Sequence, residues 1–164
     1  MRKNLLWPIG AFLVVCLLGY AARKAIGSVY GAAEAEVLLE ALSRAGLYLG
    51  SAIATASATT LALMLTLVGM INRMETDFNR EAYRNVSMVA TLATASLMLA
   101  LVVLLAFVVP VGEFEELPTG WYTVLYDVLF AGSVVMVALN AATVAMIYLT
   151  LRRVLAAVTP GDDV

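Results

Sequence analysis

The sequence contains no histidine, and its 164 residues include a single cysteine, Cys16. These absences exclude zinc sites, histidine-ligated haem, iron–sulfur clusters and Cys–His nucleophile pairs, because each needs residues that the chain lacks. Charge is also scarce, since charged residues make up 13% of the chain against about 25% in an average soluble protein. Ten basic and twelve acidic residues give a net charge of −2, so the chain lacks the positive excess typical of nucleic-acid binding. We therefore predict no catalytic residue, no metal, no cofactor and no nucleic-acid partner.

Hydrophobic residues are abundant instead, at 63% of the chain with a mean hydropathy of +0.94. A domain of this size has too much surface to hide that excess in a core, so the apolar surface is expected to face lipid. Four apolar runs cover residues 5–22, 47–71, 86–111 and 121–151, and a spanning helix needs about 20 apolar residues. We predict an all-α integral membrane protein, with residues 1–164 forming one polytopic domain built as a four-helix bundle.

Residues 32–46 are too polar to span. Their charged residues Glu34, Glu36, Glu40 and Arg44 interleave with apolar residues spaced three and four apart, which predicts an amphipathic extracytoplasmic helix. Two interpretations remain open for it. It is either a lid or docking helix on the membrane surface, or a solvated extension of the second spanning helix.

The first apolar run resembles a signal peptide, because Arg2 and Lys3 precede it and Gly19-Tyr20-Ala21 is an acceptable cleavage site. Cleavage would remove residues 1–21, and we favour an uncleaved anchor. With a cytoplasmic N-terminus and four spans, seven basic residues fall inside and three outside: Arg2, Lys3, Arg73, Arg80, Arg84, Arg152 and Arg153 against Arg23, Lys24 and Arg44. The positive-inside rule then predicts a multi-pass protein of the cell (inner) membrane with both termini cytoplasmic.

Polar residues inside the predicted spans are few. Asp127 lies about two turns below Trp121, a position more typical of the outer interface than of a proton relay. Asn140 lies near the middle of the fourth run, where an amide is expected to hydrogen-bond across a helix interface. At 100° per residue the two side chains fall on roughly opposite faces, so they are not expected to form one site.

The second run carries the clearest pattern, a stripe of small or hydroxylated residues with an arginine at each end. The stripe consists of Ser51, Thr55, Thr59, Ala62, Thr66 and Gly69, between Arg44 and Arg73. Ser87, Thr91 and Thr94 make a shorter stripe on the third run, which we interpret as a complementary face for the second. Small residues allow helices to pack closely, whereas hydroxyls can line a water-filled path in a ring of copies.

These observations predict a small non-enzymatic membrane protein that acts as a helix-packing subunit or scaffold. Its expected partners are the lipid bilayer and either further copies of itself or other membrane subunits. The alternative is an oligomeric ion channel or pore lined by the second spanning helix.

Overall fold

The computed structural model describes residues 2–27, 35–71, 80–108 and 119–158, and all of these residues are helical. The four helices are α1 (Arg2–Gly27), α2 (Ala35–Ile71), α3 (Arg80–Val108) and α4 (Thr119–Val158). Each contains a segment long and apolar enough to cross a membrane, namely Leu6–Ala25, Leu38–Gly69, Tyr83–Val108 and Thr123–Arg152. The predicted all-helical architecture with four apolar helices is confirmed, and it indicates a multi-pass membrane protein.

The predicted amphipathic helix at residues 32–46 is not separate from the second span. Helix α2 runs without a break for 37 residues from Ala35, and residues 32–34 lie outside the described part of the chain. The polar segment is therefore an extension of the long apolar helix, the second of the two interpretations given above. At about 1.5 Å per residue, α2 extends about 55 Å, well beyond a hydrocarbon core of about 30 Å.

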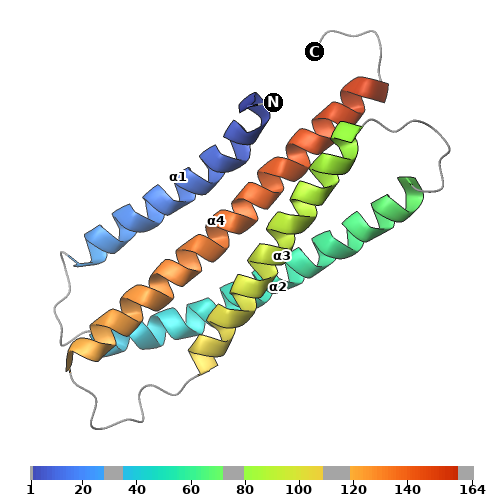
Figure 1. Ribbon diagram of the computed structural model, residues 1–164. Helices are drawn as coiled ribbons and strands as arrows, with labels where there is room; N and C mark the ends of the chain where they lie inside the picture. Colours follow the sequence, from blue (N-terminus) through green and yellow to red (C-terminus); the bar gives the residue numbers. More distant parts are fainter. Residues whose placement is uncertain (1, 28–34, 72–79, 109–118, 159–164) are drawn as a thin grey trace.

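Helix α4 is the centre of the arrangement, since it packs against α1, α2 and α3. Helix α1 lies beside α4 on the outside of the bundle (Figure 1). We refer to the end where α1 finishes and α4 begins as the Arg23 end. The core is built from α2, α3 and α4 by Leu39, Ile53, Ala100, Val103, Phe107, Tyr126, Leu129 and Met136.

Two glycines allow α2 to approach α3 closely near the Arg23 end. A Cβ atom at Gly46 would overlap the ring of Phe107, and one at Gly50 would lie 2.8 Å from a methyl carbon of Leu104. Figure 1 shows α2 crossing α3 at an angle, with its green second half leading away from the bundle. In agreement, none of residues 58–69 of α2 is buried within the chain.

Two serine hydroxyls are buried in the helix bundle. Ser57 on α2 is 2% exposed, Ser96 on α3 is 0% exposed, and neither Oγ atom has a hydrogen-bond partner among the described residues. Gly46 faces Phe107. Ser57 follows Gly46 by eleven residues on α2, and Ser96 precedes Phe107 by eleven residues on α3. The antiparallel register therefore places the two serines at the same level of the bundle.

Because these hydroxyls make no hydrogen bond, we expect Ser57→Ala and Ser96→Ala to leave the stability unchanged or to raise it by up to about 1 kcal/mol. Thermal unfolding in a mild detergent measures this. Ser133→Ala is the matched control, because the buried Ser133 hydroxyl donates to the Leu129 carbonyl at 2.9 Å, and its loss should cost about 0.5–1.5 kcal/mol. Equal destabilisation by both alanine variants, with no further loss in the double variant, would show instead that the two serines bond to each other.

Candidate functional site

An ion pair joins α1 to α4 at the Arg23 end. The Nε atom of Arg23 donates to Oδ1 of Asp127 at 2.5 Å, and the two side chains are 31% and 48% exposed. The guanidinium carbon also lies 5.3 Å from the centre of the Tyr126 ring, a cation–π geometry. Asp127, which the sequence predicts to lie at the outer membrane interface, therefore has an ion-pair partner on α1.

Tyr126 connects this pair to the core of the bundle. Its ring stacks on Phe130, with centroids 5.9 Å apart and planes inclined by 22°, and the residue is 5% exposed. Two contacts with α4 therefore fix the position of Arg23, namely the ion pair with Asp127 and the cation–π contact with the buried Tyr126 ring.

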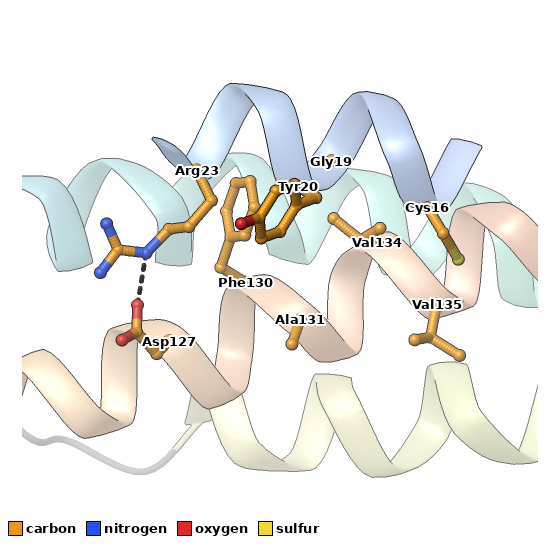
Figure 2. Close-up of a pocket in the computed structure, with 9 residues that line it drawn as sticks. All are labelled: Cys16, Gly19, Tyr20, Arg23, Asp127, Phe130, Ala131, Val134 and Val135. Carbon is orange, nitrogen blue, oxygen red and sulfur yellow. Dashed lines mark hydrogen bonds and ion pairs between the residues drawn. The ribbon is translucent and has the colours of Figure 1, made fainter. Parts of the chain in front are cut away.

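An open groove runs from the ion pair along the contact between α1 and α4, with a volume of about 490 Å³ (Figure 2). Its walls are mainly apolar and come from Cys16, Gly19, Tyr20, Phe130, Ala131, Val134 and Val135, with Arg23 and Asp127 at one end. Gly19 is essential to this contact, because a Cβ atom there would lie 2.5 Å from a methyl carbon of Val134. Volumes of about 300–1,000 Å³ are typical of small-molecule sites.

The predicted stripe on α2 lies on the side of the helix that faces away from α3. Ser51, Thr55, Thr59, Ala62, Thr66 and Gly69 are all exposed in the single chain. The buried residues Ile53 and Ser57 each precede a stripe threonine by two positions, or about 200° around the helix. None of the other described helices, α1, α3 and α4, therefore covers the stripe.

The stripe threonines satisfy their own hydrogen-bonding needs. The hydroxyls of Thr55, Thr59 and Thr66 donate to the carbonyls of Ser51, Thr55 and Ala62, four residues earlier, at 2.8–2.9 Å. Their donors are used within the helix, so no partner or water is needed to satisfy them.

The shorter stripe on α3 does not pack against the α2 stripe of the same chain. Our interpretation of it as the complementary face is therefore wrong for contacts within one chain. Ser87, Thr91 and Thr94 are exposed, and both threonine hydroxyls donate to carbonyls of their own helix. The contact between α2 and α3 uses other residues, because a helix has several faces and periodicity alone does not say which one meets a neighbour.

The remaining predicted residues occupy separate places. Arg44 is exposed and donates to Glu40 on its own helix at 2.6 Å, whereas Arg73 lies outside the described residues. Asn140 is half-buried and is not among the residues that line the groove with Asp127. Its side chain makes no hydrogen bond to any residue that the structure describes, so the expected bond across a helix interface stays a prediction.

Two features escaped the sequence analysis although each left a signal. Gly46 and Gly50 form the spacing Gly-x-x-x-Gly, which is typical of close helix contacts in membranes. Arg23 and Asp127 are opposite charges that the predicted topology places at the same end of neighbouring apolar helices. The glycine spacing is a local pattern that can be recognised in the sequence. The Arg23–Asp127 pair can be predicted only if α1 is known to pack on α4.

Within the described ranges, no three His, Cys, Asp or Glu residues are grouped so as to hold a metal ion. Comparisons with protein-family models, with curated proteins and with solved structures found no match to this chain.

If the ion pair holds α1 against α4, Asp127→Asn should loosen α1 and expose Cys16, which is only partly accessible. We expect faster labelling of Cys16 by a maleimide in detergent, and recovery of the slow rate in the charge-exchanged variant Arg23→Asp with Asp127→Arg. Glu40→Gln is the control, since it breaks an exposed pair on α2 and should leave the rate unchanged. Identical labelling rates in wild type and Asp127→Asn would show that apolar packing alone holds α1.

Proposed function

We propose that this chain is a non-enzymatic subunit or scaffold of a membrane assembly and that it associates through the stripe on α2. The occupant of this face is a helix of a second copy or of another membrane subunit. The observation that carries the proposal is that Ser51, Thr55, Thr59, Ala62, Thr66 and Gly69 are exposed on the side of α2 opposite its contact with α3.

A partner helix suits this face because small side chains allow two helix backbones to approach closely. Association of helices in lipid depends on van der Waals packing, since lipid tails are as apolar as leucine and provide no hydrophobic driving force. The side chains of the stripe are short, and the hydroxyls of Thr55, Thr59 and Thr66 are bonded to carbonyls of their own helix. The second half of α2 also leads away from the bundle (Figure 1), which leaves room for a neighbour.

In this proposal the protein resides in the cell (inner) membrane with both termini in the cytoplasm. The Arg23 end then faces outward, and the distribution of seven inner against three outer basic residues supports that orientation. The polar first turns of α2 project from the outer surface.

Extraction in a mild detergent, followed by light scattering and identification of bound proteins, tests the proposal. Purified protein in liposomes supplies the second measurement, ion flux. An assembly of two or more chains without flux supports the subunit, whereas a chain that remains monomeric and binds no other membrane protein contradicts it. A selective flux that changes in Thr59→Leu would overturn the proposal in favour of the pore.

A further inference from the structure

The groove between α1 and α4 has a polarity gradient along its length. Arg23 and Asp127 lie at one end of it, and the remaining lining is largely apolar (Figure 2). Arg23 is two residues from the end of the apolar segment Leu6–Ala25, and Asp127 is four residues inside the start of Thr123–Arg152. The charged end therefore lies near the ends of both apolar segments, while the apolar part leads toward their middle. A phospholipid has the same gradient, from a charged headgroup to an acyl chain.

The ion pair retains hydrogen-bonding capacity on both sides. Only Nε of Arg23 and Oδ1 of Asp127 take part in the bond between them. The terminal guanidinium nitrogens and Oδ2 make no hydrogen bond to the described residues, and Figure 2 shows both terminal nitrogens directed away from the carboxylate. A guanidinium has five N–H donors and matches phosphate geometry, whereas a carboxylate accepts from ammonium groups.

These free groups favour one class of headgroup. A phosphate next to a primary ammonium offers an acceptor to Arg23 and donors to Asp127. An anionic headgroup without an amine would leave the Asp127 carboxylate facing negative charge, and a quaternary ammonium has no N–H to donate. We propose that the α1–α4 groove binds a phosphatidylethanolamine-type lipid, with its phosphate on Arg23, its ammonium on Asp127 and one acyl chain along the exposed lining residues Ala131 and Val135.

The test measures lipid retained by the delipidated protein, using native mass spectrometry after incubation with equimolar phosphatidylethanolamine, phosphatidylcholine and phosphatidylglycerol of the same acyl chains. We expect phosphatidylethanolamine to be retained about tenfold over phosphatidylcholine, the factor that one charge-assisted hydrogen bond provides. Equal retention of the three lipids would overturn the proposal.

Two variants separate the acyl-chain contact from the headgroup contact. Ala131 is exposed in the groove wall, so Ala131→Phe should fill the groove without disturbing the helix contact and should abolish the preference. Ala95→Phe is the matched control, because Ala95 is exposed on α3 outside the groove, and it should retain the preference. Asp127→Asn leaves the Arg23 charge unopposed, so this variant should retain phosphatidylglycerol over phosphatidylethanolamine. Loosening of α1 would only remove the selectivity and would not reverse it. Unaltered selectivity in Ala131→Phe and in Asp127→Asn would show that the ion pair only fastens α1.

Discussion

Gly46→Leu is expected to separate α2 from α3 at the Arg23 end and to lower the unfolding temperature more than leucine at the other glycines whose surroundings the structure describes. A Cβ atom at position 46 already overlaps the Phe107 ring, and Phe107 is itself 6% exposed within the core. A leucine at position 46 and the buried Phe107 ring would therefore compete for the same space. Overpacking of a filled core costs about 1–3 kcal/mol, and a leucine adds three more carbon atoms beyond the Cβ.

Thermal unfolding in a mild detergent measures this effect. Gly10→Leu is the matched control, since a Cβ at Gly10 meets nothing within 4 Å, and its unfolding temperature should stay near that of wild type. Adding Phe107→Ala to Gly46→Leu should partly restore the unfolding temperature, because removing the ring makes room for the leucine. If Gly46→Leu unfolds at the same temperature as Gly10→Leu, the close approach of α2 to α3 does not stabilise the fold.

Thr59→Trp is expected to abolish association of the chain with its partner while leaving the bundle folded. Thr59 lies at the middle of the stripe and is exposed within the chain, so an indole there meets no residue of its own bundle. Two closely packed helix backbones cannot admit an indole between them. Light scattering after mild extraction should show the single chain, with an unfolding temperature close to that of a dissociated wild-type chain.

Val68→Trp provides the comparison for this variant. Val68 is 38% exposed and lies about 180° around α2 from Thr59, so a tryptophan there should point away from the stripe and leave the assembly intact. An assembly of normal size in Thr59→Trp would mean that the stripe reflects only an alanine- and threonine-rich composition.

The four apolar helices were predictable because length and hydropathy are local properties that lipid selects strongly. Which faces of those helices meet was not, and α2 shows why. It carries two small-residue patterns on opposite sides, one through Gly46, Gly50 and Ser57 and the other through the exposed threonines. Both patterns satisfy the same spacing rule, and only the positions of Leu104 and Phe107 decide which side meets α3.

The candidate site at the Arg23 end depends even more on long-range contacts. Arg23 and Asp127 are 104 residues apart, and hydropathy placed each near the end of a span without indicating that α1 docks on α4. Gly19 lets α1 approach Val134 closely within the groove lining, a contact that is specified by packing rather than by a motif. Periodicity therefore predicts elements and stripes, whereas sites formed between elements require the tertiary structure.

The most direct test places a photoreactive diazirine side chain at Thr59 or at Val68 in native membranes, because a carbene reacts with either protein or lipid next to it. If a partner helix covers the stripe, the Thr59 variant should give at least about tenfold more cross-links to a second protein chain than the Val68 variant, a ratio equivalent to about 1.4 kcal/mol. Val68 lies about 180° around α2 from Thr59. The two yields should become equally low once the chains are dissociated in a denaturing detergent. Equal yields in the native membrane, or a higher yield at Val68, would contradict the claim that a partner helix covers the stripe.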